Sequence, residues 1–264
     1  MSFVSNLPVV LTIAGFDPSG SAGTIADVRT LTSLGCRPVA AITSLTFQNS
    51  AGVFGAIHES ADSLRAQILP IAQEFSIDAL KIGMLPTRDM VAGVIRLLTE
   101  VNLPPPVIDP VMRSSSGYAL VEADAVDLLV DELLPMARVI TPNIPEAENM
   151  TGLRIVDEAG MREAARSLRN IGARAVLLKG GHLKPGSDNV IDLLDDGGEV
   201  VALREKWIAG PTLRGTGCVM SSAIAAHLSQ GRGLEDSVRL ARQFVSEAIR
   251  AARPENLAAQ TDFI

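Results

Sequence analysis

Short runs of aliphatic and β-branched residues recur along the chain, and a more polar stretch follows each of them. Runs this short and this apolar are typical of strands buried on both faces of a parallel sheet. The runs predicted as strands are VVLTIAG (9–15), PVAAITSLTF (38–47), IDALKIGM (77–84), PVIDPVM (106–112), RVITPN (138–143) and AVLLKGG (175–181).

The stretches between these runs carry apolar residues at helical spacing. Because strand and helix patterns alternate, the sequence predicts an α/β fold with a mostly parallel, doubly wound sheet. The apolar residues that indicate helices are Ile25, Val28 and Leu31 ahead of Gly35, Met90, Val94 and Leu97 after Thr87, and Met161, Ala165 and Leu168 ahead of Gly172.

The last third of the chain departs from this alternation. VIDLLDDGGEVVAL (190–203) has two strand-like runs around an Asp-Asp-Gly-Gly turn. This is hairpin chemistry and predicts an antiparallel edge. A final helix is expected between Leu234 and Ile249, before Pro254. No repeat or linker divides the sequence, so we expect a single domain over residues 1–264 with a core from about 8 to 253.

Composition narrows the classes of function. The formal net charge of −7 and the small number of aromatic residues argue against a nucleic-acid-binding surface. The only cysteines, Cys36 and Cys218, form neither a disulfide framework nor a thiolate metal site, which favours a reducing compartment. No apolar run is long enough to span a membrane, and PVVLTIAGF (8–16) does not have the features of an export signal. We therefore expect a cytoplasmic protein.

Ligands of doubly wound sheets bind beyond the carboxyl ends of the strands. The most informative stretch there is Arg214-Gly215-Thr216-Gly217-Cys218, in which two glycines precede a predicted helix. Unpaired N–H groups and the helix dipole favour an anion at this point, and they would lower the pKa of the Cys218 thiol enough for a base or nucleophile. The alternative is a plain helix-start turn with a small buried cysteine.

Other strand ends carry further candidates. The glycine-rich loop around Gly15, which leads to Asp27, suits a flat ligand or is an ordinary strand-to-helix turn. Asn143 and Glu146 could meet hydrated Mg²⁺ or form a helix capping box, and both could hold together. Lys179 could reach a phosphate or be solvated.

Three more residues follow predicted strands. Asp109 would meet either a metal or a cation, or it would cap the local backbone. Gln48 carries an amide that can pair with the edge of a heteroaromatic ring as donor and acceptor. Met84 could pack on a ring face, although a methionine at a strand end is equally suited to the core.

Taken together, these residues resemble the ribokinase-like superfamily, most closely its hydroxymethylpyrimidine and hydroxymethylpyrimidine phosphate kinase branch. The resemblance runs from about residue 8 to 253. It is carried by TIAGFDPSGSAGTIAD (12–27), SLTFQN (44–49), KIGML (81–85), IDPVM (108–112), ITPNIPEAE (140–148), LKGGH (178–182) and GTGC (215–218).

The resemblance implies a three-layer αβα sandwich and a homodimer. It also implies an enzyme that transfers the γ-phosphate of ATP, with Mg²⁺, to 4-amino-5-hydroxymethyl-2-methylpyrimidine and then to its monophosphate, in thiamin diphosphate biosynthesis. In that reaction Cys218 would be the base and the backbone from Gly215 to Cys218, including Thr216 and Gly217, the anion hole. The remaining implied contacts are Gly15, Asp27, Gln48, Met84 and Val111 for the pyrimidine, Lys179, Asn143, Glu146 and Arg214 for the nucleotide, and Asp109 and Glu146 for the metal.

Two other functions stay open at this point. A pyridoxal kinase of the same superfamily would act on a similar ring that also bears a hydroxymethyl group. A catalytically weak sensor would bind the pyrimidine without transferring phosphate, and two departures from the family's pattern point to it. Arg214 stands where the family usually has histidine, and Ser115 where it commonly has lysine.

Overall fold

One nine-stranded sheet organises the computed structural model, which describes residues 7–114, 116–181, 183, 189–208 and 213–252. The strand order is β3-β2-β1-β4-β5-β6-β7-β8-β9, and the six strands from β2 to β7 in that order run parallel. Strand β3 pairs antiparallel at one edge, and β8 and β9 do so at the other. The strands are β1 (Val9–Phe16), β2 (Arg37–Asn49), β3 (Gly52–His58), β4 (Ala79–Ile82), β5 (Val107–Ile108), β6 (Val139–Ile140), β7 (Val176–Lys179), β8 (Asn189–Asp195) and β9 (Val201–Lys206).

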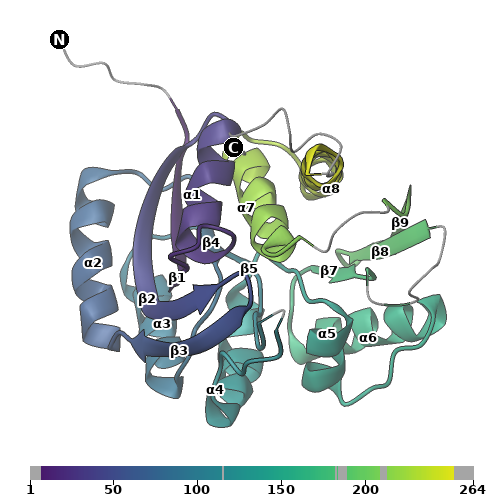
Figure 1. Ribbon diagram of the computed structural model, residues 1–264, viewed down its shortest axis with the longest axis horizontal. Coiled ribbons are helices and arrows are strands. Elements are labelled where there is room, and N and C mark those ends of the chain that lie inside the picture. Colours follow the sequence, from purple (N-terminus) through teal and green to yellow (C-terminus); the bar gives the residue numbers. More distant parts are fainter. Residues whose placement is uncertain (1–6, 115, 182, 184–188, 209–212, 253–264) are drawn as a thin grey trace.

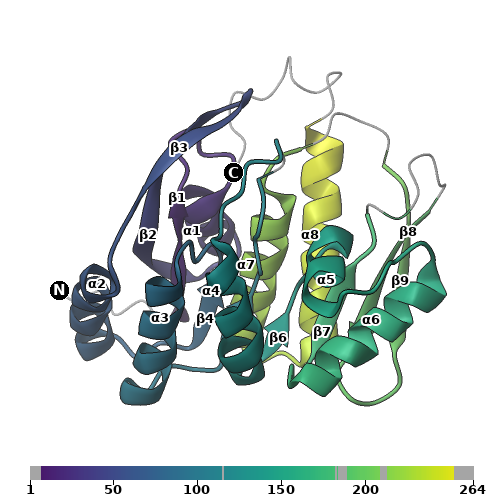
Figure 2. The same cartoon turned by 90° about the horizontal axis from the view of Figure 1, so that it is seen from below.

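Helices cover both faces of the sheet, as Figures 1 and 2 show. Four of them begin at a polar cap: the side chains of Ser60, Thr87, Asn143 and Asp157 each accept a backbone N–H of the first turn. The α-helices are α1 (Gly23–Ser33), α2 (Ala61–Glu74), α3 (Arg88–Glu100), α4 (Ala123–Leu128), α5 (Ile144–Thr151), α6 (Glu158–Ile171), α7 (Thr216–Ser229) and α8 (Leu234–Ala251).

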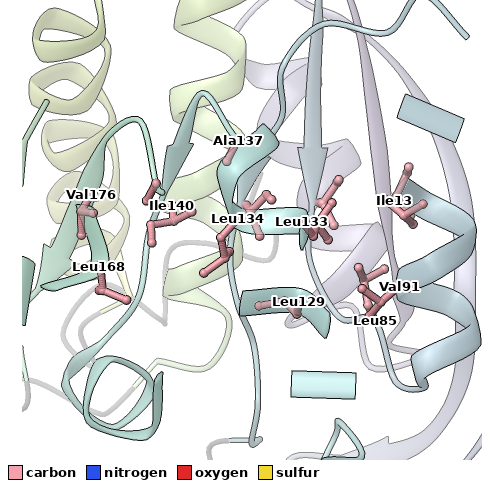
Figure 3. Close-up of a cluster of buried hydrophobic side chains, with 14 of the residues drawn as sticks. Ile13, Leu85, Val91, Leu129, Leu133, Leu134, Ala137, Ile140, Leu168 and Val176 are labelled. Carbon is pink, nitrogen blue, oxygen red and sulfur yellow. The ribbon is translucent and has the colours of Figure 1, made fainter. Parts of the chain in front are cut away.

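Alternation along the strands divides the core in two. In β1, Leu11 and Ile13 point to the cluster under α2 to α6, part of which Figure 3 shows, whereas Val10 points to the cluster under α1, α7 and α8. Successive strand residues face opposite sides of a sheet, so a strand buried on both faces must be apolar throughout. The three-layer α/β sandwich with a mostly parallel sheet is thus confirmed.

The structure adds a second antiparallel edge to the predicted one. The hairpin of β8 and β9 is confirmed, but β3 and helix α2 are not among the predictions. The signal for β3 is weak because Phe54 and Ile57 are exposed, so no buried face marks the strand. Leu64 and Ile68 after the Ser60 cap are the helical signal for α2.

Strands β5 and β6 are much shorter than their apolar runs. Each ends two residues before a proline, Pro110 or Pro142, and proline cannot donate to a strand ladder. None of the helices in the described ranges has the length and apolar character that crossing a bilayer requires. The single domain over 1–264 stays a prediction, because both ends lie outside those ranges.

Candidate active site

A cavity of about 520 Å³ opens at the carboxyl end of the parallel strands. Residues at or just beyond the carboxyl ends of β1, β2, β4, β5, β6 and β7 line it, together with the amino-terminal end of α7. This is where the sequence predicts a ligand in a doubly wound sheet.

The cavity brings together nearly all the residues that the sequence singled out. Asp27 is the exception: it is fully buried and does not line the cavity, and its contact with a ligand stays a prediction. The predicted residues that line the cavity are Gly15, Gln48, Met84, Asp109, Val111, Asn143, Glu146, Lys179, Arg214, Gly215, Thr216, Gly217 and Cys218.

The amino-terminal end of α7 is shaped by its glycines. Gly215 is the N-cap, has φ of +78°, and makes no side-chain cap. A Cβ atom at this position would lie 1.9 Å from the carbonyl oxygen of Ser21, so only glycine lets the two loops approach. The first N–H groups of α7 therefore face the cavity without a capping side chain, which is the geometry that binds an anion.

A partly buried ion pair lies directly beside this helix start. Lys179 Nζ lies 2.9 Å from Asp109 Oδ1, and a Cβ atom at Gly217 would lie 3.2 Å from Asp109 Oδ2 and 3.3 Å from Lys179 Nζ. Burial alone would lower the pKa of Lys179, but the charges of Asp109 and Glu146 raise it. Lys179 thus keeps its positive charge next to the anion-binding N–H groups.

Asn143 and Glu146 form a capping box at the start of α5. Asn143 Oδ1 accepts the backbone N–H of Glu146 at 2.9 Å, and Glu146 Oε2 accepts that of Asn143 at 2.8 Å. Burial and the neighbouring charge of Asp109 raise the pKa of Glu146 to about 7, against the lowering effect of Lys179. The structural alternative is confirmed, and Glu146 also lines the cavity.

Cys218 does not have the low pKa that its place at a helix start predicts. Burial raises the pKa of the thiol to about 11, and the charges of Asp27 and Asp109 act in the same direction. Lys81 and a hydrogen bond from the backbone N–H of Gly23, the first residue of α1, act against burial. The helix-dipole argument is wrong in sign here because it leaves out the cost of removing a thiolate from water.

Lys81 is the functional candidate that the sequence did not single out. Its side chain is fully buried, it lines the cavity, and its Nζ lies 2.7 Å from Asp27 Oδ2. Burial lowers the pKa of Lys81, but Asp27, Cys218 and Asp109 together raise it well above its usual range. A lysine inside the apolar run IDALKIGM was the available signal, because charged side chains are rarely buried without a partner.

The cavity lining also joins two segments that are far apart in the sequence. Arg214 donates to Gln48 Oε1 at 2.8 Å and to the backbone oxygen of Asn49, both at the end of β2. Gln48 therefore has its oxygen engaged and its NH₂ group as the remaining donor. Elsewhere in the lining, a Cβ atom at Gly15 would lie 3.1 Å from Met84 Sδ, so Gly15 and Met84 already pack tightly against each other. Ser115 and His182 lie outside the described residues.

Comparison with known proteins gives a consistent answer. Residues 17–261 match the model of the family described as phosphomethylpyrimidine kinase. A hydroxymethylpyrimidine/phosphomethylpyrimidine kinase of Streptomyces coelicolor is 39% identical over 252 residues, which cover 94% of this chain and 90% of that protein. A thiamine biosynthesis bifunctional protein of Geobacter sulfurreducens is 42% identical over 93% of this chain, but the chain spans only 50% of its length.

Solved structures agree with these relatives. A phosphomethylpyrimidine kinase of Clostridium difficile has a TM-score of 0.80 at 34% identity, covering 92% of this chain and 99% of that one. A pyridoxal kinase of Bacillus subtilis in complex with ADP has a TM-score of 0.85 at 32% identity, covering 95% of each chain. On the extent of the family match and the identity to full-length relatives, this chain belongs to the phosphomethylpyrimidine kinase family.

Proposed function

We propose that this protein transfers the γ-phosphoryl group of ATP to 4-amino-5-hydroxymethyl-2-methylpyrimidine and then to its monophosphate, as a step in thiamin diphosphate synthesis. The observation that carries the proposal is the meeting, in one cavity, of the uncapped start of α7, the Lys179–Asp109 pair and the Cys218 thiol. Family membership and the names of the relatives supply the substrate class.

The chemistry follows from this arrangement. The hydroxyl oxygen of the acceptor attacks the γ-phosphorus, the bond to ADP breaks, and the hydroxyl proton passes to Cys218 Sγ in its thiolate form. The N–H groups from Gly215 to Cys218 donate to the phosphoryl oxygens, and Lys179 neutralises their charge. Positioning and charge neutralisation dominate phosphoryl transfer, so these fixed groups are the ones that the reaction needs.

The acceptor is proposed to lie on the wall formed by Gly15, Gln48, Met84 and Val111. The NH₂ group of Gln48 would donate to a ring nitrogen of the pyrimidine. Arg214 is expected to act here, by holding Gln48, because it donates hydrogen bonds to Gln48 and Asn49.

The donor set fits Mg²⁺. Mg²⁺ binds through one or two carboxylates and completes its shell with water and substrate phosphates. Asp109 and Glu146 both line the cavity, and their mutual repulsion contributes to the raised pKa of Glu146, so a cation between them would be stabilised. When bound, Mg²⁺ would neutralise the charge on the nucleotide phosphates.

Replacing Glu146 with glutamine is expected to stabilise the protein without nucleotide above neutral pH. Folding raises the pKa of Glu146 from 4.5 to about 7, so the folded chain binds more protons in this window and loses stability as the pH rises through it. Glutamine keeps the capping box and removes the charge. Urea unfolding at pH 8 should give Glu146→Gln a free energy of unfolding higher by on the order of 2 kcal/mol.

Two comparisons make this test specific. Glu163, an exposed residue of α6, is the matched control, and Glu163→Gln should leave the pH profile of stability unchanged. The added stability that Mg²⁺ and ADP confer on the parent should shrink in Glu146→Gln. If the variant keeps the parent's loss of stability between pH 4.5 and 7, the assignment of that loss to Glu146 is wrong.

A pyridoxal kinase activity is the second candidate, because the Bacillus subtilis pyridoxal kinase superposes at a TM-score of 0.85. Parallel assays of the full chain with ATP and Mg²⁺ should compare the pyrimidine alcohol, its monophosphate and pyridoxal, with products identified by mass spectrometry. We expect kcat/KM to be at least about tenfold higher for the pyrimidine alcohol. A preference for pyridoxal reverses the assignment, and tight pyrimidine binding without any product establishes a sensor.

A homodimer is the proposed assembly. Leu45, Phe47 and Ile57 are exposed and lie on one face of the hairpin of β2 and β3, where Leu45 pairs with Ile57. Apolar side chains gathered in this way favour burial against another protein surface. The cytoplasm remains the proposed location, since both cysteines are free thiols.

A further inference from the structure

The buried lysine of β4 has no part in the reaction proposed above. Lys81 is fully buried, and both Lys81 and Cys218 line the cavity. Removing an ion pair from water costs several kcal/mol per ion before attraction and hydrogen bonds offset it. An apolar pair would fill the same space, so the charge itself needs an explanation.

The partner of Lys81 is held from three sides. Asp27 Oδ2 accepts hydrogen bonds from Thr12 Oγ1 at 2.6 Å and from Lys81 Nζ at 2.7 Å, and Asp27 Oδ1 accepts one from Ser222 Oγ at 2.9 Å. These bonds join β1, α1, β4 and α7. Ser222 follows Cys218 by four residues, one turn along the same face of α7, so the network fixes the turn that carries the thiol.

The position of the ammonium group is equally constrained. A Cβ atom at Gly83 would lie 2.8 Å from Lys81 Nζ. Glycine at this position therefore leaves space for the ammonium group of Lys81. The charged groups that act on the Cys218 thiol are Lys81 from β4, Asp27 from α1 and Asp109 after β5, and Cys218 in turn acts on Lys179 at the end of β7. Of the groups that lower the pKa of Cys218 and so favour its thiolate, Lys81 has the largest effect.

We propose that Lys81, fixed by Asp27, is a positioning residue whose charge stabilises the thiolate of Cys218, the form of the sulfur that accepts the proton of the acceptor hydroxyl. This inference rests on the proposed role of Cys218 as the base. It also assigns Asp27 a role away from the ligand: Asp27 holds the cation, and through Ser222 it holds the helix.

The test measures the thiol directly. Cys36 is buried away from the cavity, so a Cys36→Ala background leaves Cys218 as the only cysteine, and alkylation by iodoacetamide is followed by intact mass from pH 7 to 10. We expect Lys81→Met to lower the alkylation rate at pH 8.5 by about tenfold, because only the thiolate reacts. Turnover should fall by about 10–100-fold, with its dependence on pH shifted upward.

A second variant separates this effect from a loss of folding. Lys81→Met leaves Asp27 buried without its cation, whereas the double variant Asp27→Asn/Lys81→Met removes both charges and should recover most of the thermal stability. Because Lys81 acts on Cys218 more strongly than Asp27 does, the double variant should still be alkylated more slowly than the parent and turn over at least about tenfold more slowly.

The outcomes are distinct. Parental alkylation rates in Lys81→Met, or parental turnover in the double variant, would overturn the inference. Full activity in Cys218→Ala would instead refute the role of Cys218 as the base, and the alkylation result for Lys81 would still be measured independently of it.

Discussion

Cys218→Ala is expected to lower turnover by about 10²–10⁴-fold while nucleotide affinity changes much less. The variant removes the group proposed to accept the hydroxyl proton, and it leaves the N–H groups of α7 and the Lys179–Asp109 pair in place. Steady-state kcat and KM, together with calorimetric binding of ADP, separate the two effects.

The pH dependence provides a second check on the same thiol. Burial raises the pKa of Cys218 to about 11, so a neutral thiol predominates at pH 7 in the unliganded protein. If the thiolate is the base, turnover should rise with pH above neutrality in the parent and lose this rise in Cys218→Ala. Near-normal turnover in the alanine variant would reduce Cys218 to a packing residue.

Gly215→Ala is expected to lower turnover by at least about 10²-fold and to destabilise the protein by roughly 1–2 kcal/mol. The left-handed backbone at φ of +78° strains any residue with a Cβ atom. That atom would also lie 1.9 Å from the oxygen of Ser21, so the loop before α7 must move away from the loop before α1. The N–H groups aimed at the phosphoryl oxygens move with it, which costs transition-state stabilisation.

The chain offers a matched control for this prediction. Gly231, after the carboxyl end of α7, has φ of +80°, and a Cβ atom at this position would come within 4 Å of nothing else in the described part of the chain beyond its own neighbours. Gly231→Ala therefore carries the backbone strain without the collision. The backbone strain should lower its thermal stability about as much as the same strain does in Gly215→Ala, and its turnover should equal that of the parent. Equal turnover in the two variants would show that the approach of Gly215 to Ser21 does not position the anion site.

Most of the fold could be predicted because burial on both faces leaves a strong pattern. The strands from β1 to β7 that lie inside the sheet are continuous apolar runs, and the hairpin of β8 and β9 carries its own turn residues. Strand β3 could not be predicted in the same way. It lies at an edge, pairs with a bulge and leaves Phe54 exposed, so neither alternation nor a buried run marks it.

The location of the site was also predictable, because the chemistry-bearing residues follow parallel strands and therefore share one edge of the sheet. The electrostatics were not. The pKa of Cys218 depends on burial of the thiol and on the charges of Lys81, Asp27 and Asp109. These residues are far from Cys218 in the sequence, so only the fold brings them together. Asp27 looked like a ligand contact from its motif, yet its three hydrogen bonds direct it to Thr12, Lys81 and Ser222.

The hydrogen bond between Ser222 and Asp27 joins residues 195 positions apart. During synthesis, a nascent chain that has emerged from the ribosome only as far as the end of β9 still lacks Cys218 and the start of α7. Phosphoryl transfer can therefore begin only after α7 has emerged and docked. A chain that terminates before residue 222 should therefore be inactive. Measurable turnover would show that translation has passed this residue.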